Sequence, residues 1–156
     1  MGLNEFLNKE YFPAMHSAEH ILNQTMVRKF KINRSFSNHI ERKKSKCDYY
    51  FIRNLIAEEI TEIESQVNLI ISQNLIISER FISKAEAESL FNLEKLPDPS
   101  VEIIRIIDIG DYDSCPCSGN HVSNTSEIGM FKIISSDFSN NILRIRYKLL
   151  PNKYDI

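Results

Sequence analysis

His16 and His20 lie four residues apart in the stretch AMHSAEHIL, which otherwise has the pattern of a helix. On a helix, side chains at this spacing are neighbours on one face, with Cβ atoms about 5–6 Å apart, so both imidazoles can reach one metal ion. A single histidine pair also arises by chance. A metal site therefore needs further ligands from another part of the chain.

A second pair lies in the segment DYDSCPCSGNHV, where Cys117 and His121 are also four residues apart. The segment contains Pro and Gly, so we expect a loop whose backbone can wrap around an ion. Thiolate and imidazole are good zinc ligands, and three histidines with one cysteine complete a four-coordinate set. Cys115 could replace Cys117, because spacing alone does not choose between them. The two pairs together predict a zinc site.

The first pair must be positioned by a helix that the sequence places from Pro13 to about Phe30, since Pro is favoured in the first turn. Apolar residues occur on more than one side of this helix, so we expect the histidines to face a partly dry pocket. Glu19, between them, is expected to be an exposed or subsidiary polar residue. The stretches RSFSNHI and KCDYYFI predict two short strands joined by a basic connection.

A second helix is predicted from about Leu55 to Asn74, because its apolar residues recur every three or four positions. Ser83 with Glu86 forms the pattern of a capping box that opens a third helix, which should end before Pro97. The remainder has the character of strands: VEIIRIIDI, MFKIISS and ILRIRYKLL, the last two joined by SDFSNN as a hairpin.

These elements predict an α+β fold, with a mostly antiparallel sheet and helices packed against it, as a single domain over residues 1–156. With 156 residues, 42% hydrophobic and 26% charged, the chain is long enough for a real core. No apolar run approaches the roughly 20 residues of a membrane span, and MGLNEF lacks a signal-peptide core, so we expect a cytoplasmic protein with no membrane partner. Three cysteines, an odd number, favour metal binding over a disulfide framework.

Positive charge gathers in one part of the chain, because residues 28–53 hold nine of the nineteen Lys and Arg. A basic face on a nearly neutral protein can attract a polyanion. A solvated surface segment would have the same composition, and charge alone does not choose between the two.

The stretches HSAEH and CSGNHVSNTSEIGMFKI resemble the HxxxH and CxxxH motifs of the editing domain of alanyl-tRNA synthetase. IESQVNLIISQNL resembles the acidic helix of that family and KAEAESLF the segment after it, so the resemblance runs from about Pro13 to Leu149. A separate domain of this size is similar to the AlaX proteins, which hydrolyse mischarged alanine tRNA in trans. The second domain of threonyl-tRNA synthetase shares the fold and is the nearest competitor.

The resemblance implies a Zn²⁺ site formed by His16, His20, Cys117 and His121 beside the pocket where the aminoacyl ester is cleaved. It implies tRNA as partner, with no role for DNA, and Ser-tRNA(Ala) as substrate, with Gly-tRNA(Ala) as a further candidate. By distance from His20, the polar residue facing the bound amino acid would be Ser37, with Asn38 and His39 beside it.

The attacking water would be held at the zinc site. The sequence does not identify a protein base for catalysis. It does not indicate the oligomeric state either. Candidate tRNA contacts are the basic residues between the first two strands: Arg42, Lys43, Lys44 and Lys46. Two positions depart from the family pattern. Cys115 stands where the family often has an acidic residue, with Asp113 two residues earlier, and Asn120 stands where the synthetase domain usually has Thr.

Other functions remain open at this point. The substrate could be Ser-tRNA(Thr), or the chain could be a non-catalytic RNA-binding module that zinc stabilises. His16 to His20 also fits H-x-x-E-H, the inverted zinc-peptidase motif in which the glutamate is the general base. That interpretation leaves Cys117 and His121 unexplained.

Overall fold

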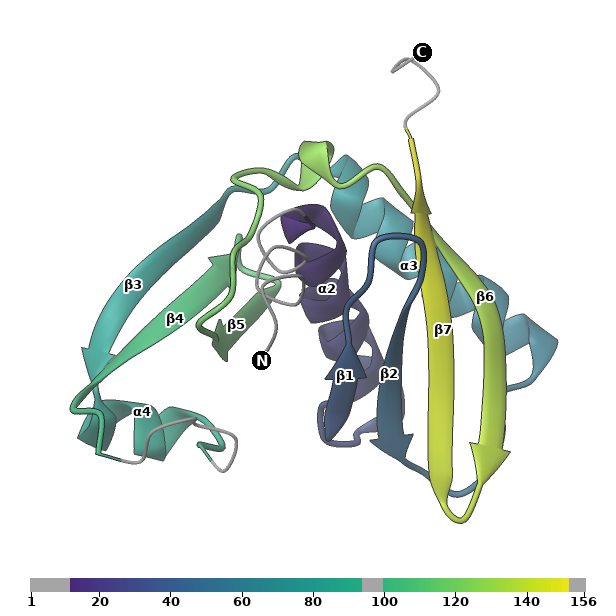
Figure 1. Ribbon diagram of the computed structural model, residues 1–156, viewed down its shortest axis with the longest axis horizontal. Coiled ribbons are helices and arrows are strands. Elements are labelled where there is room, and N and C mark those ends of the chain that lie inside the picture. The colour runs from purple at the N-terminus through teal and green to yellow at the C-terminus, as the bar shows by residue number, and fades with distance from the viewer. Residues whose placement is uncertain (1–11, 94–99, 152–156) are drawn as a thin grey trace.

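The computed structural model describes residues 12–93 and 100–151 (Figure 1). The helices are α2 (Pro13–Phe30), α3 (Ala57–Ser72) and α4 (Lys84–Leu90), with a short 3-10 helix η1 (Thr125–Glu127). The strands are β1 (Ser37–His39), β2 (Ser45–Tyr50), β3 (Ile77–Ser83), β4 (Ile103–Ile109), β5 (Asp113–Pro116), β6 (Met130–Ser139) and β7 (Ile142–Leu150). The α+β class and the antiparallel strand pairing are as predicted.

A four-stranded antiparallel sheet, in the order β1-β2-β7-β6, forms the larger part of the core. In β7, Leu143, Ile145 and Tyr147 are fully buried, while the basic residues between them are partly exposed. The buried row packs against apolar residues of α2 and α3 in one cluster. The Tyr147 hydroxyl also donates to the backbone oxygen of Met15, which ties the sheet to the start of α2.

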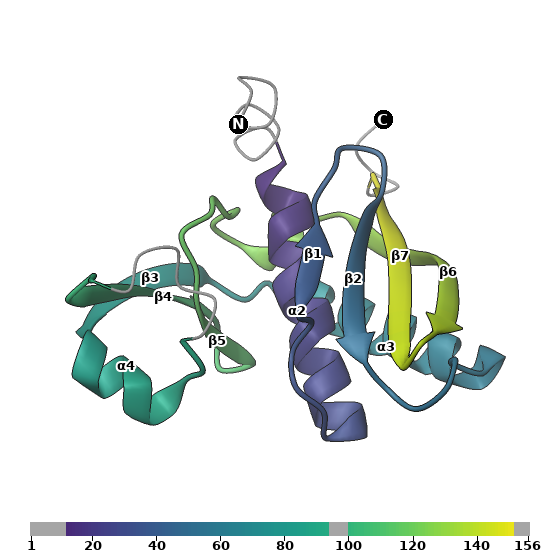
Figure 2. The same cartoon turned by 60° about the horizontal axis from the view of Figure 1, so that its bottom comes forward.

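The remaining strands form a separate three-stranded antiparallel sheet in the order β3-β4-β5, with α4 packed against it. Figures 1 and 2 show this smaller sheet on the opposite side of α2 from the larger one. Helix α2 contacts both α3 and β5. It is therefore covered on more than one side, as its apolar pattern predicts, and ten of its residues are buried.

The second sheet is the main feature that the sequence did not predict. Strand β3 escaped notice because five of its seven residues are exposed, so it lacks a clear apolar alternation. Strand β5 has only four residues and falls in the segment that was predicted as a loop.

The boundaries of the predicted elements are close to those observed. Helix α2 has the predicted bounds, and the Ser83 hydroxyl accepts from the backbone N–H of Glu86 at the start of α4. The predicted hairpin connection SDFSNN is too long, because β6 continues to Ser139 and only Asn140 and Asn141 turn the chain. Both have positive φ (52° and 62°), the conformation that asparagine tolerates in two-residue hairpins.

The third helix, α4, ends at Leu90 and so before Pro97, as predicted. The single-domain extent of 1–156 stays a prediction. In the part of the chain that the structure describes, no helix combines the length and the apolar character needed to cross a bilayer.

Ile145→Ala should lower the free energy of unfolding by about 2–5 kcal/mol, because it opens a cavity under a fully buried strand residue. Urea denaturation measures this change. Leu69→Ala is the matched control: Leu69 is 51% exposed on α3, so its truncation should shift the free energy by under about 0.5 kcal/mol. Equal effects of the two substitutions would contradict this placement of the core.

Candidate metal centre

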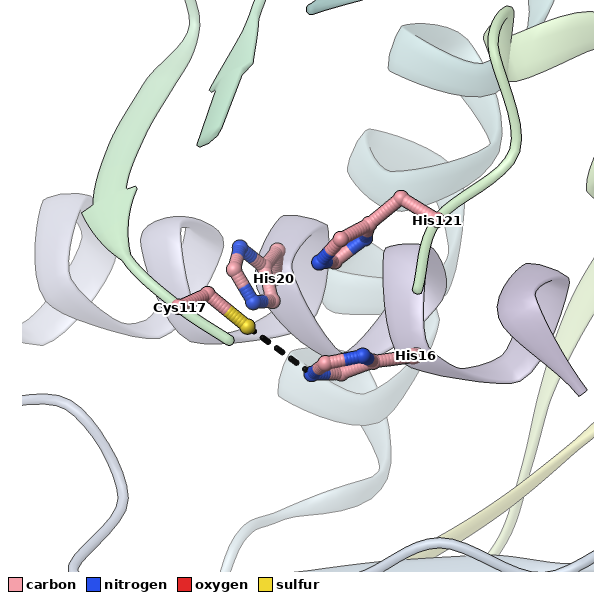
Figure 3. A group of neighbouring side chains, drawn as sticks. All are labelled: His16, His20, Cys117 and His121. Atoms are coloured by element: carbon pink, nitrogen blue, oxygen red, sulfur yellow. Dashed lines mark hydrogen bonds between the residues drawn. The ribbon is translucent and has the colours of Figure 1, made fainter. Parts of the chain in front are cut away.

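Two elements bring the candidate ligands together. His16 and His20 lie one turn apart on α2, and Cys117 and His121 lie in the loop that follows β5. Because β5 packs against α2, this loop crosses the histidine face of the helix. Figure 3 shows the four side chains pointing toward one another. We call this set the four-donor cluster: His16, His20, Cys117 and His121.

The donor atoms of the four-donor cluster all lie within 4.8 Å of one another. Cys117 Sγ is 3.4 Å from His16 Nε2, and the ring centroids of the three histidines are 4.2–5.1 Å apart. In a tetrahedral zinc site with three nitrogens and one sulfur, the donors are about 3.3–3.7 Å apart. The observed set is slightly wider than that, so an ion requires only a small contraction.

The outward-facing nitrogen of each imidazole meets a polar partner. His16 Nδ1 is 3.2 Å from the backbone oxygen of Asn120, and His121 Nδ1 is 3.0 Å from Ser17 Oγ. His20 Nδ1 is 3.6 Å from Asp113 Oδ2. At this distance His20 Nδ1 makes no hydrogen bond among the described residues. With an ion bound, a proton on each Nδ1 would face these partners and leave each Nε2 lone pair toward the cluster. The buried His121 Nε2 has no hydrogen-bond partner among the described residues, so this arrangement fits a bound ion.

Asp113 is the most heavily engaged of these partners. Its carboxylate accepts from Gln24 Nε2 at 3.0 Å and from Arg34 Nη1 at 2.6 Å. Burial alone would raise the pKa of Asp113, but His20 and Arg34 lower it below its ordinary value. The carboxylate therefore stays charged beside His20, the position that fixes an imidazole for metal binding. Asp113, two residues before Cys115, is thus an acidic group next to His20.

The cluster residues themselves have strongly shifted pKa values. Burial alone would raise the pKa of the Cys117 thiol, but the three histidines around it lower it to about 3. Burial opposes charge on His20 as well, yet Asp113, Cys117 and Glu19 raise its pKa to about 9. Burial lowers the pKa of His121 to about 4. Cys117 is therefore a thiolate at neutral pH, the form that binds metal.

Gly119 allows the loop to approach the helix closely. A Cβ atom at this position would lie 2.2 Å from His16 Cε1 and 2.5 Å from His16 Nδ1, both atoms of the ring. Only glycine fits without moving the ring or the loop.

Cys115 lies on β5 and is not part of the four-donor cluster. Burial raises the pKa of its thiol to about 12. Ser37 lies on β1 with its side chain exposed, and its predicted contact with the amino acid stays a prediction. The buried serine of this region is Ser35, whose backbone N–H donates to Asn23 Oδ1 at 2.7 Å.

The basic residues of the predicted tRNA contact lie in and beside the β1–β2 connection. Arg42, Lys43 and Lys44 are exposed there, whereas Lys46 Nζ lies 3.6 Å from Asp48 Oδ2. Figures 1 and 2 show this connection at the end of the molecule where α2 begins. His16 is in the first turn of that helix, so the exposed positive charge and the four-donor cluster belong to the same end.

Sequence reasoning named Asp113 and Asn120 without their contacts, missed Ser17, and did not predict the burial of Glu19. Glu19 was expected to be exposed or subsidiary, but it is 6% exposed and lies beside both helical histidines. Its position follows from the packing of β5 and of the main core cluster around α2, which residue spacing does not show. The sequence held one indication of this position. Apolar residues on more than one side of α2 predict burial on several sides, which leaves no solvent-facing stripe for the residues between the histidines.

These features define an α+β domain with a candidate three-histidine, one-cysteine metal centre. Residues 104–146 match the family model of the threonyl and alanyl tRNA synthetase second additional domain. In this part the chain is therefore similar to that family.

Relatives extend the similarity over most of the chain. The alanine–tRNA ligase of Methanocella arvoryzae is 31% identical over 144 residues, which cover 89% of this chain and 16% of the ligase. A Saccharomyces cerevisiae protein named "Putative alanyl-tRNA editing protein alaX" is 32% identical over 137 residues, 78% of this chain and 30% of that protein. The chain thus spans less than a third of the length of these relatives.

Gly119→Ala should weaken metal binding by about 10- to 100-fold while the fold is retained, because the added methyl group displaces His16 or the loop. Competition with a chromophoric chelator measures the affinity, and circular dichroism checks the fold. Ser118→Ala, at the exposed neighbouring position, is the control and should bind as the original chain does. Unchanged binding by the Gly119 variant would show that the loop does not approach α2 in this way.

Proposed function

We propose that this chain hydrolyses the ester bond of mischarged aminoacyl-tRNA with the help of Zn²⁺, and that Ser-tRNA(Ala) is its preferred substrate. Gly-tRNA(Ala) is a further candidate. The observation that carries the proposal is the convergence of one thiolate and three imidazole donors within 4.8 Å of one another. The chain that brings them together is similar to a domain family of tRNA synthetases. The curated relative named for alanyl-tRNA editing supports the same activity.

The four-donor cluster would hold the zinc ion, and the bound ion would polarise the ester carbonyl or lower the pKa of water. The chain's own residues prepare this site. Asp113 and Ser17 orient two of the imidazoles, and Arg34 keeps the Asp113 carboxylate charged. Glu19 and Asp113 place negative charge around His20, so the site has the polarity that a divalent cation requires.

Recognition of tRNA would use the exposed positive charge of the β1–β2 connection. The phosphate backbone dominates the affinity of nucleic-acid complexes. Among the described residues, no ion pair joins Arg42, Lys43 or Lys44 to an acidic side chain. Because the connection lies at the same end as the cluster, a bound acceptor end could reach both. Selection of serine over alanine would then require a buried polar group that pairs with the serine hydroxyl, since an unmatched donor costs about 1–3 kcal/mol.

A second candidate is a zinc-stabilised RNA-binding module without catalytic activity. The observation that favours it is the donor count, because four protein ligands in a tetrahedral set are typical of structural zinc. Ser-tRNA(Thr) is the alternative substrate within the deacylase proposal, because the matched family covers both synthetases. A peptidase would not require Cys117 and His121 in the cluster.

The test of the proposed function is deacylation of serine, glycine and alanine on alanine tRNA, beside serine on threonine tRNA, with the chain added to tRNA charged beforehand. We expect release of serine from alanine tRNA and sparing of alanine. Cys117→Ala should lose zinc and lower the rate by about 100-fold or more, because it removes an anionic ligand. Ser114→Ala, at an exposed position of β5, is the control. Tight tRNA binding with bound zinc but without hydrolysis would favour the binding module.

Reversing charge at Lys43 and Lys44 together, each to Glu, should weaken tRNA binding and reduce its dependence on salt by about 0.9 in log–log slope per lost phosphate contact. Hydrolysis of a minimal aminoacyl ester should be unchanged. The control is Lys31→Glu, an exposed lysine at the other end of α2. Equal loss on tRNA and on the minimal ester would contradict this separation of binding from chemistry.

A further inference from the structure

Glu19 has one carboxylate oxygen that faces the candidate metal centre and pairs with nothing else. Its Oε2 lies 3.6 Å from His20 Nε2 and 4.0 Å from His16 Nε2. These are the two nitrogens that α2 offers to an ion. The oxygen is buried and has no hydrogen-bond partner among the described residues, and the side chain is only 8% exposed.

The other carboxylate oxygen is anchored, which fixes the direction of the free one. Glu19 Oε1 accepts from Asn23 Nδ2 at 3.0 Å. Asn23 in turn accepts, through Oδ1, from the backbone N–H of Ser35 at 2.7 Å. The three residues form a chain of contacts from the segment before β1 to the cluster, so the Glu19 side chain cannot rotate away without breaking buried hydrogen bonds.

A buried carboxylate oxygen needs a positive or hydrogen-bonding partner. Protonated imidazole would serve in the absence of an ion. Once His16 and His20 give their Nε2 lone pairs to a metal, however, neither ring has an N–H left on the side that faces Glu19. The ion would then be the positive group on the side of the cluster that this oxygen faces.

We propose that Glu19 is a fifth donor of the metal centre, next to the four-donor cluster, and that Asn23 positions it. This inference rests on the proposed metal binding and adds a residue to it. Two anionic donors, the Cys117 thiolate and the Glu19 carboxylate, neutralise a divalent cation. A purely structural zinc usually has a closed tetrahedral set of four ligands. A fifth donor would make this site five-coordinate instead.

The test is Co²⁺ substitution of the full chain, followed by absorption spectroscopy and by competition for Zn²⁺ with a chromophoric chelator. Five-coordinate Co²⁺ absorbs more weakly in the visible range than four-coordinate Co²⁺, and a thiolate ligand adds a charge-transfer band in the near ultraviolet. Glu19→Gln keeps the size of the side chain and removes its charge. We expect stronger visible absorption in this variant and about 10- to 100-fold weaker Zn²⁺ binding, with the thiolate band retained.

Glu58→Gln removes the same charge from an exposed position on α3 and should change neither spectrum nor affinity. Asn23→Ala, which frees the Glu19 side chain, should shift the spectrum in the same direction as Glu19→Gln but by less. Circular dichroism of the chelator-treated variants checks that each one folds. If Glu19→Gln does not fold, Glu19→Asp replaces it as the test variant.

If Glu19→Gln has the same spectrum and the same Zn²⁺ affinity as the wild-type chain, Glu19 is not a fifth donor. The four-donor cluster would be unaffected by that result. Failure of the wild-type chain to bind Co²⁺ or Zn²⁺ at all would overturn the proposed metal site and this inference together.

Discussion

The packing of β5 against α2 is the contact on which the candidate site depends. The helix alone offers two imidazoles one turn apart, and the loop alone offers a thiolate and an imidazole. Neither pair fills the coordination shell of an ion. The loop reaches the helix because Gly119 has no side chain to keep it away from the His16 ring. One close backbone approach therefore turns two incomplete pairs into a single set of donors.

Burial gives this set its chemical character. Helix α2 is enclosed by the larger sheet and α3 on one side and by β5 and its loop on the other, so the cluster is partly shielded from solvent. In that environment the polar contacts around the rings determine their charge and orientation. Asp113, held by Arg34, fixes His20, and Ser17 fixes His121. The anionic surroundings that result suit a divalent cation, and the unpaired Glu19 oxygen belongs to the same surroundings.

Much of this arrangement could be predicted from the sequence, for reasons that differ between elements. Helix α2 and strand β7 have clear apolar periodicity, so their existence and faces follow from local pattern. The donor residues could be identified because both pairs have ligand spacing and resemble known motifs. The contact of Asp113 with His20 could not, because it depends on tertiary docking between segments about ninety residues apart. The burial of Glu19 could not either, because it depends on what packs against α2. Strand β3 was missed since an exposed edge strand lacks the alternation that marks a half-buried one.

The most direct measurement of the central claim is the zinc content of the intact chain by native mass spectrometry, for the original sequence and for His16→Ala and Cys117→Ala. The account predicts one zinc ion per chain in the original protein. It also predicts loss of that ion when a donor is removed from either the helix or the loop, since both are needed to hold it. A chain that retains its zinc without His16 or without Cys117 would contradict a shared site.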